Sequence, residues 1–148
     1  MISIQRSCIA LLLYAGTVSS ALAQNDFAQV AAKEPGAKVT ASGLVFRSLQ
    51  DGQGASPVAT DKVKVHYRGT FPDGKEFDSS FKRNQPIDFP LNAVIPCWTE
   101  GVQLMKVGGK AKLTCPPAIA YGARGAGGVI PPNATLQFEV ELIAIAGR

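Results

Sequence analysis

Two segments of this chain alternate apolar and polar residues so regularly that they constrain the fold more than any other feature. In residues 62–68 and again in residues 134–146, almost every second side chain is apolar. Because successive side chains of a strand point to opposite faces, this alternation predicts half-buried antiparallel strands. The predicted buried positions are Val63, Val65 and Tyr67 in the first segment, and Leu136, Phe138, Val140 and Leu142 in the second.

The rest of the pattern predicts shorter strands and a single helix. The shorter strands are predicted over residues 44–49, 86–89 and 110–115. Trp98, Val102 and Met105 lie at helical spacing and follow Pro96, a residue that the first turn of a helix tolerates. A loop rich in glycine and proline covers residues 116–133. Together these patterns predict the α+β class: a mainly antiparallel sheet with one short helix packed on one face.

Residues 1–23 predict a secretory signal peptide. Arg6 supplies a positive charge, residues 8–18 form an apolar run too short to span a bilayer, and Ala21-Leu22-Ala23 has the small-residue pattern of a cleavage site. The alternatives for this segment are a buried amphipathic helix or a membrane anchor. We expect cleavage after Ala23 and export, with the periplasm as the destination.

The chain after the predicted cleavage site divides into two parts. Residues 24–42 predict a flexible leader, with a short helical stretch at 27–33 before a break at Pro35-Gly36. Residues 43–148 predict one folded domain, a length typical of a single domain. No further run is long and apolar enough to cross a membrane, so no stable membrane insertion is expected after cleavage.

The residues that common catalytic machinery requires are scarce. His66, the single histidine, lies on the polar face of a predicted strand, so no Ser-His or Cys-His arrangement is expected. Asp73, Glu76 and Asp78 could suggest acid–base catalysis, but Asp73 lies in a predicted turn. The glycines of residues 122–128 lack the Lys-Ser/Thr of a phosphate-binding loop. The net charge is +4 and the basic residues are dispersed, so we expect no nucleic acid partner. Several His or Cys ligands at suitable spacing are lacking, so we expect no metal, and we expect no cofactor.

Five motifs follow one another along the chain. They are VHYRGT at 65–70, DGKEFDSS at 73–80, VIPCW at 94–98, AYGARG at 120–125 and IPPNATLQFEVEL at 130–142. Together they resemble the FKBP family of macrolide-binding peptidyl-prolyl cis-trans isomerases, in its bacterial exported single-domain form. The resemblance covers residues 43–145 and implies an antiparallel sheet of five or six strands wrapped around one short helix.

The resemblance also implies a substrate pocket. Trp98 resembles its floor, Asp78 its carboxylate, and Arg83 a basic residue associated with that carboxylate. The remaining positions are Tyr67, Phe77 and Phe138 as aromatic walls, Val94 and Ile95 as the rim, Tyr121 as a phenol that contacts substrate, and Ile130 in the loop over the pocket. Ile87 stands where many members carry an aromatic wall residue, which implies a wider pocket on that side. From periodicity alone, the aromatic residues are interpreted as core.

The activity implied by the resemblance is isomerisation of X-Pro bonds in exported proteins. The expected partners are proline-containing polypeptides and macrolide inhibitors such as tacrolimus, and the protein is expected to be a monomer. Two alternatives are a chaperone or partner-binding module that uses the same pocket with little turnover, and a structural domain that keeps only the fold.

Two cysteines remain after the predicted cleavage, Cys97 and Cys115. Cys97 replaces a glycine that is common in the family just before the tryptophan. In an oxidising compartment the two residues could form a disulfide. The alternative is two buried thiols that behave as small apolar side chains.

Overall fold

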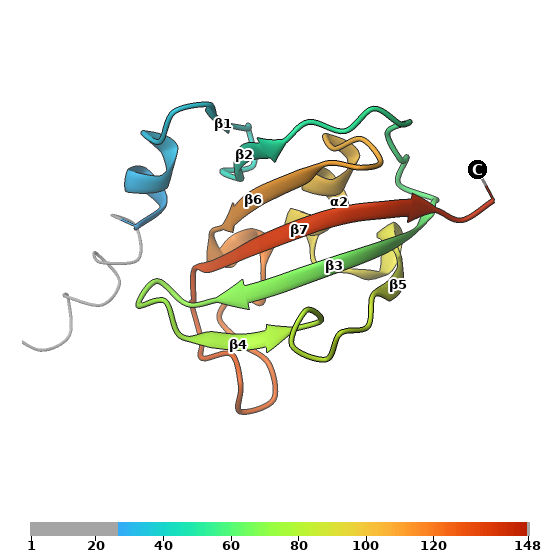
Figure 1. Cartoon of the computed structure of the whole chain (residues 1–148). Helices are drawn as coiled ribbons and strands as arrows, with labels where there is room; N and C mark the ends of the chain where they lie inside the picture. Colours follow the sequence, from blue (N-terminus) through green and yellow to red (C-terminus); the bar gives the residue numbers. More distant parts are fainter. Residues whose placement is uncertain (1–26, 148) are drawn as a thin grey trace, which may run out of the picture.

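Seven antiparallel strands form one sheet in the part of the chain that the structure describes, residues 27–147 of a computed structural model. The predicted signal peptide lies outside these residues. The strands are β1 (Ala37–Val39), β2 (Val45–Gln50), β3 (Lys62–Thr70), β4 (Glu76–Ser79), β5 (Ile87–Pro90), β6 (Lys110–Cys115) and β7 (Leu136–Ile145). Their order is β1-β2-β6-β7-β3-β4, and β5 also pairs with β3. Helix α2 (Pro96–Gln103) follows β5 and lies against one face of the sheet (Figure 1).

The two alternating segments form the centre of this sheet, as the sequence predicts. Strands β3 and β7 pair along most of their length, with Tyr67 opposite Val140 and Val65 opposite Leu142. All the apolar positions predicted to face inward are buried, and Val63 and Val65 have no exposed surface. The core therefore lies between the inner faces of these strands and α2.

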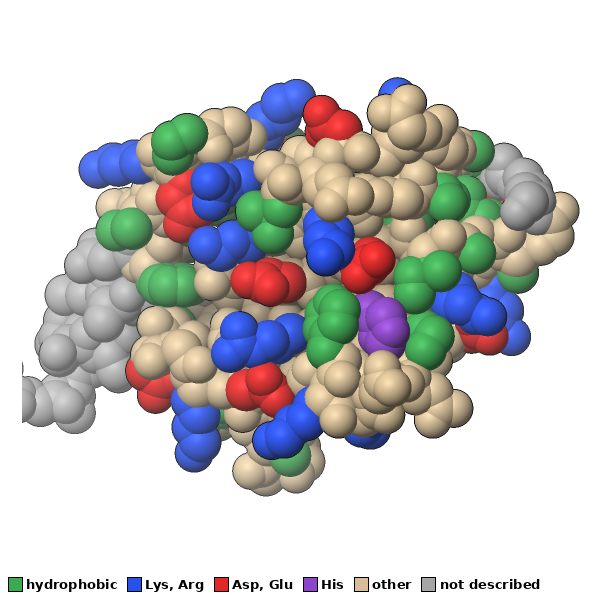
Figure 2. Space-filling model, in the orientation of Figure 1, with side chains coloured by type: hydrophobic (Ala, Val, Ile, Leu, Met, Phe, Trp, Pro, Cys, Tyr) green, Lys and Arg blue, Asp and Glu red, His purple; other side chains and the backbone are tan. Residues whose placement is uncertain are grey.

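The outer face of the sheet carries interspersed charges (Figure 2). Arg68 of β3 pairs with Glu76 of β4 at 2.8 Å, and Lys110 of β6 lies 3.9 Å from Glu141 of β7. His66 also lies on this face, where its ring stacks on Phe81 with centroids 4.7 Å apart. On β3 and β7, these side chains occupy the polar positions of the alternating sequence pattern.

Helix α2 (Pro96–Gln103) packs its predicted apolar face into the core. Trp98, Val102 and Met105 are all buried, although the helix ends before Met105. Gly101 brings the helix close to β6, because a Cβ at this position would lie 2.8 Å from Cδ2 of Leu113. The absence of a side chain at Gly101 thus allows this close approach.

Residues 27–42, the described part of the segment predicted as a flexible leader (24–42), add structure to one edge of the sheet. Residues 27–32 form a helix, in agreement with the predicted helical stretch, and β1 pairs with β2. The carboxylate of Glu34 lies 2.8 Å from Arg47 of β2 and 3.2 Å from Lys112 of β6. These partners are distant in sequence, so composition alone gave no sign of the contact.

Three shorter elements complete the frame. Strand β4 is not predicted by the sequence pattern, because its residues Glu-Phe-Asp-Ser contain a single large apolar side chain and show no alternation. A 3-10 helix, η1 (Leu91–Ala93), joins β5 to α2, and a second, η2 (Pro117–Ile119), follows β6. Among residues 27–147, no helix is long and apolar enough to cross a membrane.

Candidate functional site

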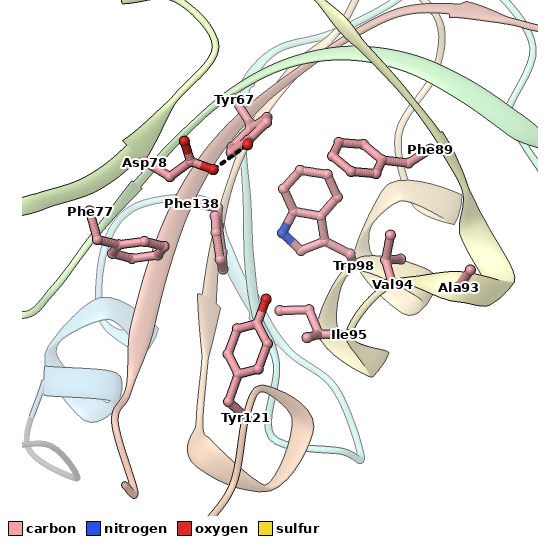
Figure 3. A pocket seen from close by; sticks show the side chains of 10 residues that line it. All are labelled: Tyr67, Phe77, Asp78, Phe89, Ala93, Val94, Ile95, Trp98, Tyr121 and Phe138. Carbon is pink, nitrogen blue, oxygen red and sulfur yellow. Dashed lines mark hydrogen bonds between the residues drawn. The ribbon is translucent and has the colours of Figure 1, made fainter. Parts of the chain in front are cut away.

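A cavity of about 490 Å³ opens between α2, β5 and the inner face of the sheet. Most of its lining is aromatic or aliphatic, and the side chains come from five regions of the chain (Figure 3). The lining residues are Tyr67, Phe77, Asp78, Phe89, Ala93, Val94, Ile95, Trp98, Tyr121 and Phe138. Its size lies within the range of small-molecule binding sites.

Trp98 lies at the base of the cavity and contacts three other aromatic rings edge-to-face. Its ring centroid is 5.2 Å from that of Tyr67 and 5.4 Å from those of Phe89 and Phe138. Phe138 in turn meets Phe77 edge-to-face at 5.7 Å. Aromatic pairs favour this arrangement because the positive edge of one ring meets the negative face of the other. The rings therefore hold one another in a defined orientation.

The indole nitrogen of Trp98 is a notable exception in this packing. Trp98 is only 5% exposed, and its Nε1 has no hydrogen-bond partner among residues 27–147. Buried polar groups in proteins are nearly always paired. The pocket floor thus keeps one donor that the protein itself leaves unsatisfied.

A polar cluster of three residues occupies one side of the cavity. The hydroxyl of Tyr67 donates a hydrogen bond to Asp78, and Arg83 donates to Oδ1 of Asp78 at 2.7 Å. Arg83 also donates to the Tyr67 hydroxyl at 3.3 Å. Both oxygens of the carboxylate are therefore engaged by donors from the protein.

These contacts shift the pKa values of the cluster. Burial raises the pKa of Asp78, but the hydrogen bonds from Arg83 and Tyr67 outweigh it, so this pKa lies below its ordinary value. Burial, followed by the hydrogen bond to the Asp78 carboxylate, raises the pKa of Tyr67. At neutral pH Asp78 is charged and Tyr67 is neutral. A carboxylate with a low pKa and two bound donors is a poor general base.

Tyr121 lines the cavity from the loop after η2. Tyr121 is 40% exposed, and no hydrogen bond to its hydroxyl is found within residues 27–147. Its phenol ring extends along the side of Ile95, with the hydroxyl directed into the cavity (Figure 3). Tyr121 is thus a free hydrogen-bonding group at the edge of an apolar pocket.

A second hollow of about 410 Å³ adjoins the first. Phe77, Asp78 and Tyr121 line both, and the loop adds Ala126, Gly127, Val129 and Ile130. A bridge between Ala126 and Ile130 shapes this part of the loop. The predicted residue Ile130 therefore lies beside the main cavity rather than in it.

The structure brings together most of the residues that the family resemblance singled out. The eight that line the main cavity are Tyr67, Phe77, Asp78, Val94, Ile95, Trp98, Tyr121 and Phe138. Arg83 contacts the cavity through Asp78.

The predicted residue Ile87 lines neither the main cavity nor the second hollow. It lies in β5 opposite Val65. Phe89, two residues later on the same face of β5, supplies an aromatic wall against Tyr67 and Trp98. β5 thus contributes an aromatic ring to the cavity, from residue 89 rather than residue 87. The sequence pattern could have identified Phe89, because Phe89 lies two residues after Ile87 and faces the same side of the strand. No sequence feature pointed to Ala93, the other lining residue that was not predicted.

Cys97 and Cys115 are joined by a disulfide. Cys97 lies in the first turn of α2 and Cys115 ends β6, and neither has any exposed surface. Within residues 27–147, no cluster of three or more His, Cys, Asp or Glu side chains could hold a metal ion. His66 does not line the cavity, and its Nδ1 lies 2.9 Å from Oγ of Ser80.

Comparison with known proteins identifies relatives across most of the chain. Residues 53–143 match the family model described as FKBP-type peptidyl-prolyl cis-trans isomerase. A protein of Aeromonas hydrophila named FKBP-type peptidyl-prolyl cis-trans isomerase FkpA is 59% identical over 114 residues, which cover 77% of this chain and 42% of the relative. The FKBP-type 22 kDa peptidyl-prolyl cis-trans isomerase of Escherichia coli is 54% identical over 114 residues, covering 77% of this chain and 55% of the relative. The chain thus spans about half the length of these curated relatives.

Solved structures show the same fold. The crystal structure of FkpA from Escherichia coli matches with a TM-score of 0.80 at 47% identity, covering 82% of this chain and 57% of that one. A peptidyl-prolyl cis-trans isomerase from Pseudomonas syringae pv. tomato also matches with a TM-score of 0.80, at 42% identity. That match covers 88% of this chain and 96% of the other.

Proposed function

This chain belongs to the family of FKBP-type peptidyl-prolyl cis-trans isomerases, and from that premise we propose that it accelerates the cis–trans isomerisation of X-Pro bonds in polypeptides. The observation that carries the proposal is the aromatic cavity over Trp98, which combines an apolar floor with the free hydroxyl of Tyr121. The proposed substrates are proline-containing polypeptides.

The chemistry requires no nucleophile, metal or cofactor. Amide resonance gives the peptide bond a rotational barrier of about 18–20 kcal/mol. Both isomers of an X-Pro bond are accessible, but they exchange in tens to hundreds of seconds without a catalyst. An enzyme accelerates the exchange by binding the twisted amide more tightly than either planar form.

The cavity supplies this preference through its low polarity. A planar amide has charge separated between its nitrogen and oxygen, and twisting the bond reduces this separation. The aromatic lining around Trp98, Phe138 and Tyr67 replaces water around the bound bond, so the planar form loses more solvation than the twisted form does. The prolyl ring is accepted over the face of Trp98.

Polar groups at the edge then orient the rest of the substrate. The Tyr121 hydroxyl and the backbone amide of Ile95 are the proposed hydrogen-bonding partners of the substrate backbone. Asp78 acts indirectly, because it holds the Tyr67 ring in place through the hydrogen bond between them. Arg83 keeps the carboxylate charged and oriented.

The proposal extends to cellular location and ligands. Export to the periplasm is supported by the sequence pattern of residues 1–23 and by the Cys97–Cys115 disulfide, since such bonds persist in oxidising compartments. Tacrolimus and related macrolides are the proposed inhibitors, and the protein is proposed to act as a monomer. The alternative is a chaperone or partner-binding module that uses the same cavity with little turnover.

The test is the isomerisation rate of a short X-Pro peptide, measured directly by NMR exchange with and without tacrolimus. We expect a rate well above that of buffer, abolished by the macrolide. Tyr121→Ala should lower the rate, whereas Leu104→Ala removes a similarly exposed side chain outside the cavity and should not. A rate equal to that of buffer, with macrolide binding retained, would support the binding module instead.

A further inference from the structure

The Cys97–Cys115 disulfide connects two parts of the cavity that come from different regions of the chain. Cys97 lies between Ile95, which forms part of the rim, and Trp98, which forms the floor. Cys115 ends β6 and is followed by the loop that carries Tyr121 six residues later. The bond therefore joins the chain segment of the floor and rim to the segment that leads into the Tyr121 loop.

The loop is anchored to the core by Ile130, which is 6% exposed, whereas Tyr121 itself lies at a solvent-exposed part of the loop. The Tyr121 hydroxyl has no protein partner within residues 27–147, and the ring is 40% exposed. The nearby backbone contacts stay within the loop: Gly122 N–H donates to the carbonyl of Pro117 at 2.9 Å, and Asn133 N–H donates to the carbonyl of Gly122 at 2.8 Å. The placement of Tyr121 therefore depends on the root of the loop at Cys115, on the neighbouring Ile119 and Ala120 that pack against the core, and on the buried Ile130 further along the loop.

The helix side is docked on β6 by a second contact, one turn further along. Gly101 lies against Leu113, and Val102 is fully buried. This packing holds the middle of α2 whether or not the disulfide is present. What the disulfide adds is a fixed position for the first turn of α2, where Ile95 and Trp98 lie.

We propose that the Cys97–Cys115 disulfide is a positioning element of the substrate pocket, which holds the floor at Trp98 in register with the loop that carries Tyr121. This proposal rests on the proposed isomerase function. Opening the bond leaves the fold intact but lets the first turn of α2 and the loop root move independently. Since binding depends on groups held within fractions of an ångström, the pocket loses preorganisation.

The bond can be opened by thiol–disulfide exchange with a dithiol reductant. The reductant gives up two electrons and two protons and ends as its own disulfide, while Cys97 and Cys115 become two thiols. Because both residues are fully buried, the protein is unfolded and refolded in the reductant, and free thiols are counted to verify the reduction. The reduced protein retains every heavy atom of the oxidised one.

The test compares oxidised protein, reduced protein and the double variant Cys97→Ala/Cys115→Val, which replaces both sulfurs by apolar groups. Ile145→Ala is the control, because it creates a cavity at the far end of β7 and leaves the disulfide in place. Isomerisation is measured well below the melting temperatures of all four proteins.

The fluorescence of Trp98, the only tryptophan, is a second measurement. Its emission wavelength is recorded rather than its intensity, because a neighbouring disulfide quenches fluorescence.

We expect kcat/KM to fall about tenfold in the reduced protein and the double variant, mainly through a higher KM, because the groups that contact substrate are all retained. Trp98 emission should move to longer wavelength, and tacrolimus should bind more weakly. Ile145→Ala should melt at lower temperature with KM and emission unchanged. The reductant should have no effect on the double variant.

Three outcomes distinguish the proposal from its alternatives. If reduction lowers only the melting temperature, as in Ile145→Ala, the disulfide is a stabilising crosslink and the proposal is wrong. If neither the reduced protein nor the double variant folds, the bond is required for the fold itself, and the proposal is also overturned. If the oxidised protein has no isomerase activity, the proposed function fails, while emission and tacrolimus affinity still test the positioning role.

Discussion

The cavity has two sides that are built in different ways. Its floor consists of side chains on regular elements: Tyr67 on β3, Trp98 on α2 and Phe138 on β7, all buried and in edge-to-face contact. Its other side is the loop 116–133, where Tyr121 is 40% exposed and Val129 is 56% exposed. One side is part of the hydrophobic core, and the other is mostly in contact with solvent.

The two sides are also stabilised by different interactions. Burial and ring packing hold the floor, whereas backbone hydrogen bonds and the one buried side chain of residues 116–133, Ile130, hold the loop. Ala126 and Ile130 exchange two backbone hydrogen bonds, of 2.9 and 3.0 Å. Gly125 has a φ of +67°, and a Cβ there would lie 2.3 Å from the carbonyl oxygen of Ile130. Changes in the floor should therefore affect stability and function together, and changes at exposed loop side chains such as Tyr121 should affect function alone.

The largest effect is expected from Phe138→Ala. Phe138 contacts both Trp98 and Phe77, and its loss leaves a cavity in the floor. The free energy of unfolding should fall by about 3–5 kcal/mol, with activity lost as well. Urea unfolding followed by circular dichroism measures this, with Val129→Ala as the loop control, expected within about 0.5 kcal/mol of the parent. A loss below about 1 kcal/mol would contradict the assignment of Phe138 to the core.

The second prediction concerns the two inward residues of β5. Phe89→Ala should lower stability by about 1–2 kcal/mol, because the ring is partly buried, and should raise KM because it lines the cavity. Ile87→Ala is the matched control, since it lies on the same face of the same strand outside the cavity. Steady-state isomerisation and urea unfolding are measured for both. An equal rise of KM in the two variants would mean that β5 acts only through the core.

A smaller effect, dependent on pH, is expected from Asp78→Asn. Folding lowers the pKa of Asp78 below its ordinary value of 3.8. The charged carboxylate therefore stabilises the fold fully at pH values above the pKa of the unfolded chain. This stabilisation disappears as the pH falls through the lower pKa of the folded protein. At neutral pH the variant should be about 1 kcal/mol less stable, because the carboxylate is partly exposed. The difference between the two proteins should narrow below pH 3.8. Unfolding curves across this range test it; a constant difference would exclude a role for the charge.

The smallest change in stability is expected from Tyr121→Phe, which removes one hydroxyl from the loop side. The free energy of unfolding should stay within about 0.5 kcal/mol of the parent. If the hydroxyl bonds the substrate, kcat/KM should fall about two- to tenfold, the value of one hydrogen bond. An unchanged kcat/KM would show that only the ring of Tyr121 contributes.

The sequence by itself determined the elements whose pattern repeats along the chain. The alternation around Val65 and Phe138 and the helical spacing of Trp98 and Val102 each matched the observed burial. These predictions succeed because the direction of a side chain follows the local period of its strand or helix. The family resemblance then identified eight residues of the cavity, although periodicity alone had interpreted its aromatic residues as core.

Only the tertiary structure decided which of these side chains meet. Phe89 rather than Ile87 faces the cavity, although both point inward, because the register of β5 on β3 places Phe89 beside Trp98. Glu34 attaches a segment predicted to be flexible through partners on β2 and β6. In both cases the contacting residue lies on another strand or helix, and the distance between the two residues is set by strand register and helix packing. The local periodicity of the sequence contains no information about strand register or helix packing.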